Sequence, residues 1–288
     1  MKLMTGRERK QKDSPWIHIV LMGYVLISLY PLLWAFQNSF KRHVDIISYP
    51  FAPIKNFTIQ NYIDAWNTSN VNVYLANSFI VSIIASAATV VMAAMTAYAL
   101  VRIPYKRINQ AIMTVLLLAI MVPGATILVP LYAFVRNFEN YFGFQIYDTY
   151  LSLIFPYATF GLAISVMIIK AFMSAMSKEL EEAAVMDGLN IFGLFFRIVF
   201  PICLPALVSV FIVNYLNNWN EFIMANLLLS KESLRTLAVG VAAFKDMLNT
   251  NYGGLFAATM YSVIPVVVVY VILQDKIIDG LTAGSLKG

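Results

Sequence analysis

Long apolar segments alternate with short polar segments along the whole of this 288-residue chain. A helix that crosses a bilayer needs about 20 largely apolar residues. Six windows reach that length without a charged residue: 14–40, 65–101, 108–135, 149–169, 198–220 and 247–274. Strands of a membrane barrel would alternate polar and apolar positions, but Val115–Val122 and Val266–Leu273 are apolar throughout. The pattern predicts an all-α membrane protein with six transmembrane helices.

The predicted spans divide the chain into one membrane domain and two tails. The domain covers residues 15–279, and a polar loop at 176–201 separates the fourth span from the fifth. Residues 1–14 and 280–288 are the predicted N-terminal segment and C-terminal tail. The spans are expected at about 16–38, 75–101, 108–135, 149–171, 202–228 and 256–275.

Proline residues interrupt several of these apolar segments. Proline removes a helix hydrogen bond, and in lipid that bond must be replaced by neighbouring helices or by water. Kinked helices around a shared cavity suit a transporter, although proline is also common in ordinary membrane helices. The prolines in question are Pro31, Pro123, Pro130, Pro156, Pro205 and Pro265.

Composition agrees with a membrane protein and sets its orientation. Hydrophobic residues make up 60% of the chain and charged residues only 12%, whereas about a quarter of a soluble domain is charged. The net charge of +5 comes from basic residues in short loops, so it indicates topology rather than nucleic-acid binding. Of the 20 lysines and arginines, 13 lie on the side of the N-terminus, and the other seven are mostly in longer loops. Both termini are therefore predicted to be cytoplasmic.

Residues for catalysis, metal binding or nucleotide binding are lacking in the sequence. Cys203 lies alone in an apolar segment, and His18 and His43 are isolated, so no metal-ligand spacing is present. A phosphate-binding loop requires a Gly-Lys pair, and the chain contains none. We expect no catalytic residue, no metal and no cofactor in this chain, so any ATP would have to be hydrolysed by another protein.

The loop between the fourth and fifth spans carries an acidic segment, Glu179 to Asp187, that ends at Gly188. Leu180, Ala183 and Ala184 fall at helical spacing and predict one apolar, small-residue face. A second short helix, Ile191–Phe200, is expected to end at Pro201. Two interpretations are open: a solvated linker between spans, or a docking element whose alanines permit close approach and whose acidic rim pairs with a basic partner.

At this loop the sequence resembles the membrane subunits of ATP-binding-cassette importers. Their signature is Glu-Ala-Ala, three residues, Gly, nine residues, Ile, one residue, Leu-Pro. This chain matches the spacing, with Phe200 in place of the leucine. The resemblance implies a cytoplasmic coupling helix that docks into a cleft of an ATPase subunit. The residues assigned to that coupling are Glu181, Glu182, Ala183, Ala184, Asp187, Gly188, Ile198 and Pro201.

The resemblance extends over nearly the whole chain and is closest to carbohydrate permeases of the maltose type, specifically the shorter, six-span subunit. It is carried by Pro50-Phe51, by the segment 57–62 and by the tail 280–288, which departs from the family only at Ser285-Leu286. In that family the tail reaches toward the interface of the ATPase pair. The resemblance therefore implies ATPase contacts at Thr282, Gly284 and Lys287.

Polar residues also crowd one half of the fifth span, where the segment 219–222 resembles the family's Trp-Asn-acid-Phe motif. Such groups are costly in a membrane and usually functional. Sugar contact, a gate, packing between helices and a proton relay through the carboxylate are all compatible with them. The candidate residues for a substrate pathway or gate are Asn214, Asn217, Asn218, Trp219, Asn220 and Glu221.

The resemblance and the residues together predict a permease subunit of a binding-protein-dependent, ATP-driven importer for an oligosaccharide or another sugar. The expected partners are a second homologous permease, two cytoplasmic ATPase subunits that bind ATP and magnesium, an extracellular or periplasmic solute-binding protein, and membrane lipid. The expected location is the bacterial cell (inner) membrane. The alternative is an ion-coupled secondary transporter or channel subunit, which would be expected to carry charges in matched halves.

Overall fold

The computed structural model describes residues 15–67, 69–244 and 251–282, with side chains from Trp16 to Gln274. Within these ranges the chain is helical and contains no strand, as the sequence predicts. The N-terminal segment 1–14 and the predicted tail contacts Gly284 and Lys287 lie outside the described residues. Thr282 is the last residue of the final helix.

Six membrane spans fit the helices of the described chain. Four helices are long and apolar enough to cross a bilayer alone, and two bent pairs can each provide one more span. The four are α1 (Pro15–Ser39), α4 (Val71–Arg102), α8 (Leu151–Ser174) and α15 (Tyr252–Thr282). The bent pairs are α5 (Lys106–Met121) with α6 (Gly124–Arg136), and residues 191–202 with α12 (Leu204–Asn220).

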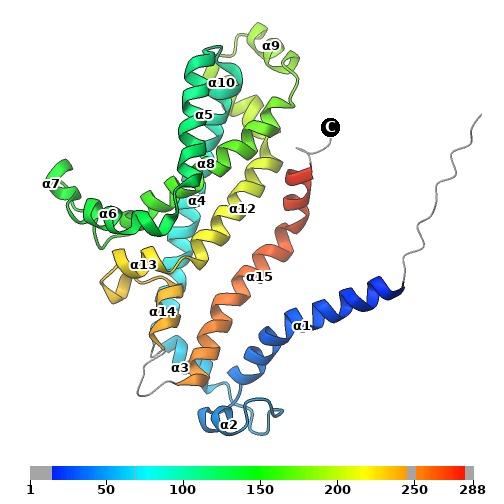
Figure 1. The fold of residues 1–288 in the computed structure, drawn as a ribbon, viewed down its shortest axis with the longest axis vertical. Helices are drawn as coiled ribbons and strands as arrows, with labels where there is room; N and C mark the ends of the chain where they lie inside the picture. Colours follow the sequence, from blue (N-terminus) through cyan, green and yellow to red (C-terminus); the bar gives the residue numbers. More distant parts are fainter. Residues whose placement is uncertain (1–14, 68, 245–250, 283–288) are drawn as a thin grey trace, which may run out of the picture.

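Helix α4 lies at the centre of the bundle and packs against α8 and α12 (Figure 1). Its inward face carries Ala85, Ala93, Ala94 and Ala97, all of them fully buried. Small residues let helix backbones approach closely, and in a membrane such packing replaces the hydrophobic effect as the source of association. The row of alanines therefore explains how α8 and α12 can pack closely against this span.

The third predicted span is not one continuous helix, which differs from the single span expected over 108–135. Helices α5 and α6 meet at an angle of 101°. Val122 has an extended backbone between them, with φ −77° and ψ 120°, and Pro123 follows. Proline disfavours the helical conformation of the residue before it and has no N–H to continue the ladder. The sequence showed the proline but not the size of the bend.

Two helices expose much of their apolar surface. The most apolar 18-residue window of α1 has no buried residue, and Figure 1 shows this helix diverging from the bundle. Helix α5 likewise has no buried residue. Since such surfaces need lipid or another apolar partner, the exposed helices agree with a membrane protein that is part of a larger assembly.

Short helices cap the two ends of the bundle (Figure 1). One end carries α9 (Glu179–Met186), followed by α10 (Ile191–Leu194), a π-helical turn at Phe195–Val199 and α11 (Phe200–Ile202). On the side away from α9, α7 (Phe138–Phe142) and α13 (Ile223–Leu228) lie at mid-height beside α6, as Figure 1 shows. Toward the opposite end follow a 3₁₀ turn at Glu232–Leu234, α14 (Leu237–Ala243), α3 (Gln60–Asn67) and α2 (His43–Ser48). We call the first the α9 end and the opposite one the far end.

Candidate functional site

The predicted helix of the acidic loop is present as α9 and stops as its sequence indicates. Gly188 has φ +84°, a left-handed conformation that glycine adopts without steric cost. The Gly188 amide donates to the Val185 carbonyl and the Leu189 amide to the Ala184 carbonyl. These two bonds form a Schellman motif, which satisfies carbonyls left free by the end of the helix. A built Cβ at Gly188 would meet no neighbour, so the constraint is conformational only.

The faces of α9 differ from the sequence expectation. Ala184 is buried, but Leu180 and Ala183 are exposed, so the three do not form one inward face. Glu181 takes the inward position beside Ala184 and is only 8% exposed. The prediction of an apolar face was wrong, because helical periodicity gives no information about distant residues that could pair with a buried carboxylate.

That partner is Arg102, the last residue of α4. Its Nε donates to Glu181 Oε1 at 2.8 Å, and its second terminal nitrogen also contacts that oxygen. The Tyr98 hydroxyl lies 3.5 Å from the other carboxylate oxygen. An inward carboxylate is costly unless it is paired and hydrogen-bonded. Arg102 and Tyr98 were missed by sequence reasoning, which treated Arg102 only as a topology signal.

The remaining coupling candidates separate into an exposed and a partly buried set. Glu182, Asp187 and Gly188 are exposed on α9 and its end. Ile198 is half-buried in the π-helical turn, and Pro201 is exposed in α11. The second helix does not end at Pro201, as expected, but continues to Ile202 and then bends by 76° into α12. The wider turn that precedes the proline accommodates its ring and its missing N–H.

Apolar side chains of the same loop point away from the bundle. Met186 is 87% exposed, Phe192 is 67% exposed and Leu180 is 53% exposed, and Ile191 is exposed beside them. A soluble linker would place such residues inward, since exposed apolar groups gain nothing from water. Several exposed apolar side chains in one short loop, together with the exposed Glu179, Glu182 and Asp187, are typical of a protein interaction surface.

The polar residues of the fifth span fall into different environments. Asn214 is buried and donates to Ser165 Oγ of α8 at 2.9 Å, and Asn218 is buried and donates to Ser86 Oγ of α4 at 3.1 Å. Gly161 of α8 leaves the space that the Asn214 side chain fills. These two amides therefore hold α12 against its neighbours, which is the packing alternative rather than substrate contact.

Trp219 and Glu221 also have structural partners. Trp219 is fully buried and donates through its indole N–H to the Ser262 carbonyl of α15 at 3.2 Å. The Glu221 carboxylate accepts from the amides of Met224 and Ala225 and from the Tyr157 hydroxyl at 2.7 Å. Carboxylates stabilise helix N-termini in this way. Glu221 follows the last residue of α12 and accepts the first amides of α13, which begins at Ile223, so the helix breaks there instead of continuing to 228 as expected.

Asn217 and Asn220 are the exposed members of the group. Asn217 lines a cavity of about 200 Å³ between α8 and α12, together with Tyr157, Asn214, Asn218 and Glu221. Asn220 donates to the Leu216 carbonyl within its own helix. Of the six candidate residues, Asn217 is the one that is both exposed and on the cavity wall.

Comparisons with known proteins agree with this architecture. The family model described as "Binding-protein-dependent transport system inner membrane component" matches residues 89–281. The "Probable ABC transporter permease protein YurM" of Bacillus subtilis is 34% identical over 96% of this chain and 89% of its own length. The trehalose/maltose transport system permease protein MalG of Thermococcus litoralis is 30% identical over 94% and 96%.

A solved structure has the same fold. It is a crystal structure of a bacterial ABC transporter involved in the import of the acidic polysaccharide alginate. The matched chain has a TM-score of 0.79 and 19% identity, over 94% of this chain and 99% of that one. The family match covers the α9 loop and every span from the middle of α4 onward. The chain therefore belongs to the family of inner membrane components of binding-protein-dependent transport systems.

Proposed function

We propose that this chain is one of two permease subunits in an ATP-driven importer for an oligosaccharide or another sugar. The substrate class is supported by relatives named for trehalose/maltose, diacetylchitobiose and arabinooligosaccharides. The assembly adds a homologous permease, two ATPase subunits and an extracellular or periplasmic solute-binding protein. One solved structure of the same fold is an alginate transporter in complex with a sugar-bound periplasmic protein.

The observation that carries the proposal is the surface of α9. Its inward face is held by Glu181 and Ala184, and its outward face presents Leu180, Glu182 and Met186. We place this surface in the cytoplasm, with both chain termini, and seat it in a cleft of an ATPase subunit. Closure of the ATPase pair around ATP then displaces α9 and alternates access across the membrane. Such coupling requires that ATP favour one state of the spans over the other.

In the same proposal Asn217 contacts the substrate or its gate, while Asn214, Asn218, Trp219 and Glu221 keep the pathway helices in place. The four structural residues each have a bond to another helix or to a helix start. A self-sufficient proton-coupled transporter would need an acid free to exchange protons. The Glu221 carboxylate is instead engaged in three hydrogen bonds.

Co-purification and uptake test the function. The full chain, expressed with its genomic neighbours, should purify with an ATPase and a second permease. Cells should take up at least one of labelled maltose, trehalose or diacetylchitobiose. Glu182→Lys reverses an exposed charge on the docking face, and Gly188→Pro is incompatible with φ +84°. Both should abolish uptake and leave membrane insertion intact. Normal uptake by either variant would contradict the docking role.

A further inference from the structure

Helix α4 is attached at both of its ends to segments distant in sequence. At the α9 end its last residue, Arg102, binds Glu181. At the far end Tyr74 donates to the Glu232 carboxylate at 3.0 Å, and Asn77 donates to the carbonyls of Ser233 and Arg235. The Ser78 hydroxyl accepts from the Leu237 amide at 2.7 Å. One continuous helix of 32 residues thus connects the docking loop with the segment 232–237.

The Arg102–Glu181 pair is placed to resist separation. The two side chains are 15% and 10% exposed, so water screens them little. Arginine stands in the last turn of α4 and glutamate in the first turn of α9. Each charge therefore also complements the dipole of its own helix. Removing one partner would leave the other charge inward and unpaired, which is far more costly than an exposed break.

Helix α9 has few other bonds to the spans. It is joined to α8 through residues 175–178 and to α10 through residues 187–190. Among the described side chains, Glu181 is the one from α9 that hydrogen-bonds to a spanning helix. Glu179 and Glu182, on the same short helix, are exposed.

We propose that Arg102 and Glu181 are positioning residues that make α9 and α4 one rigid unit. Movement of α9 then enters the membrane through α4 and reaches the segment 232–237 at the far end. The spans nearest in sequence, α8 and α12, follow α4 through their packing against it. The inference rests on the proposed function, because it takes α9 to be the part that the ATPase moves.

The test measures the distance between α9 and α4 in the assembled importer. Spin labels are attached to Val185→Cys on α9, an exposed position outside the named docking residues, and to Met95→Cys on α4, also exposed, after Cys203→Ala. Pulsed electron resonance then gives the distance distribution with and without a non-hydrolysable ATP analogue and magnesium. With the pair intact, we expect one distribution in both conditions. A shifted mean on nucleotide addition would overturn the rigid unit.

Variants of the pair give the opposite expectation. In Arg102→Gln and Glu181→Gln, nucleotide should shift the mean distance or add a second population. The double variant removes both charges and so leaves no unpaired charge, which makes it the working variant where a single one fails to assemble. The mean distance in the double variant should shift no more than in the single variants, because the effects of two residues that act as a unit are not additive. Distributions that stay as in wild type in the double variant would refute the proposal.

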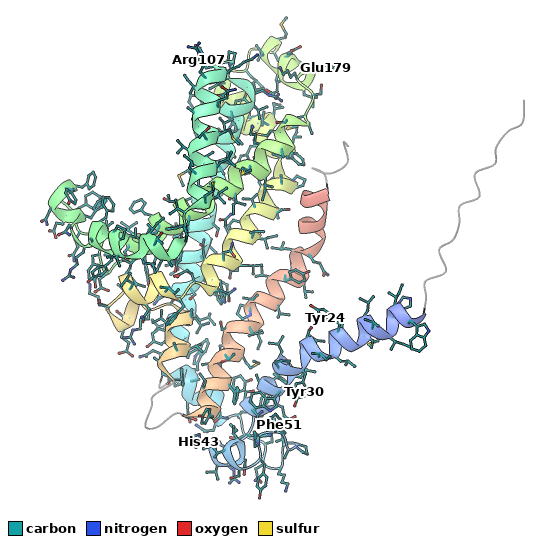
Figure 2. All side chains as sticks on the ribbon, in the orientation of Figure 1. Tyr24, Tyr30, His43, Phe51, Arg107 and Glu179 are labelled. Carbon is teal, nitrogen blue, oxygen red and sulfur yellow. The ribbon has the colours of Figure 1, made fainter. Side chains whose placement is uncertain are left out.

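Conservative and control variants separate positioning from general damage. Arg102→Lys keeps the charge and should restore a single distribution. The matched control is Arg107→Gln, an exposed charge at the same end of the bundle (Figure 2). It should leave the distribution as in wild type, and a control that shifts like the pair variants would count against the specific role of Arg102 and Glu181.

The same preparations distinguish failure of this inference from failure of the proposed function. If no ATPase accompanies the wild-type chain, the function itself is wrong and so is the inference. If the ATPase is bound and the pair variants still hold α9 at its wild-type distance, only the inference falls.

Discussion

The two ends of this molecule are held together in different ways. At the far end, hydrogen bonds join segments up to 209 residues apart in the chain. Asn61 donates to the carbonyls of Ser39 and Lys41, both at 2.8 Å, and Asp148 accepts from the amides of Ser230 and Lys231. At the α9 end, one ion pair joins α9 to a spanning helix, and apolar side chains of α9 are exposed.

This difference indicates which part can move. Regions with many buried hydrogen bonds open only at high free energy, whereas elements used in switching have few. The far end also contains a buried lysine, Lys41, whose ammonium donates to three carbonyls of residues 49, 50 and 52. Its burial lowers the pKa of that ammonium. We interpret the far end as the fixed frame and α9 as the part that changes position.

The largest effect is expected at Gly188, where the α9 end depends on one backbone conformation. Gly188→Val should abolish sugar uptake, since a β-branched residue is strongly disfavoured at φ +84°. Gly188→Asn should retain uptake, because asparagine tolerates the left-handed region and the site has room for its Cβ. Uptake assays on cells with equal membrane levels of each variant make the comparison. Equal activity in the two variants would show that the turn is not required.

A large stability effect is expected at Asp148, which holds the frame together. This residue has φ +58° and accepts two backbone amides with one oxygen. Asp148→Ala should lower the free energy of unfolding by about 1.5–3 kcal/mol per charged hydrogen bond lost, before any strain. Thermal unfolding in detergent measures the loss. Asp148→Asn keeps an acceptor and tolerates the backbone, so it should lose much less. An unchanged thermal stability in Asp148→Ala would contradict the interpretation of the far end as a fixed frame.

A smaller loss is expected at Asn77. Its amide donates to the Ser233 and Arg235 carbonyls and accepts from the Tyr150 hydroxyl at 2.6 Å. Asn77→Ala should lower the free energy of unfolding by about 1–3 kcal/mol, because its hydrogen-bond partners are left unpaired. Thermal unfolding in detergent measures this loss. Asn72→Ala is the control, because Asn72 is exposed on the same helix and bonds only to the next amide. Similar losses in the two variants would mean that the network adds nothing.

The smallest effect is expected for the exposed pair of Arg42 and Asp45. The hydrogen bond from Arg42 lowers the pKa of the Asp45 carboxyl. A lowered folded-state pKa stabilises the protein above the ordinary pKa of that acid, and the contribution disappears as the pH falls through the lowered value. Arg42→Gln should therefore change the melting temperature little at neutral pH, because exposed ion pairs contribute little to stability. In acid, the small drop in melting temperature that comes from protonation of Asp45 should be absent from the variant. A large change at neutral pH would show that this pair belongs to the frame.

Much of the fold could be predicted from the sequence, because membrane spans depend on a local property. Apolar length predicted six spans, which the four long helices and two bent pairs of the described chain fit, and Gly188 marked the end of α9 at the correct residue. The bends were harder, since Pro123 and Pro201 look alike in sequence. At Pro123 the helix is broken, and α5 and α6 meet at 101°. Pro201 instead lies within a continuing helix, because the π-helical turn at Phe195–Val199 precedes it.

The roles of the polar residues could not be predicted, because they depend on pairs distant in the chain. Glu181 looked like its neighbour Glu182, and only Arg102, 79 residues away, turns it inward. Glu221 looked like a candidate gate, yet Tyr157 and two amides of α13 occupy its carboxylate. A helical wheel shows which residues share a face. It gives no information about the distant partner residues that determine which face is buried.

Labelling of Met186→Cys most directly tests whether α9 docks on an ATPase. The variant is made with Cys203→Ala, and its rate of reaction with a maleimide is measured in the permease alone and in the assembled importer. Phe51→Cys, at an exposed position of the far end, is the control (Figure 2). We predict strong protection of position 186 by the ATPase and none of position 51. Equal labelling of position 186 in both preparations would contradict the account.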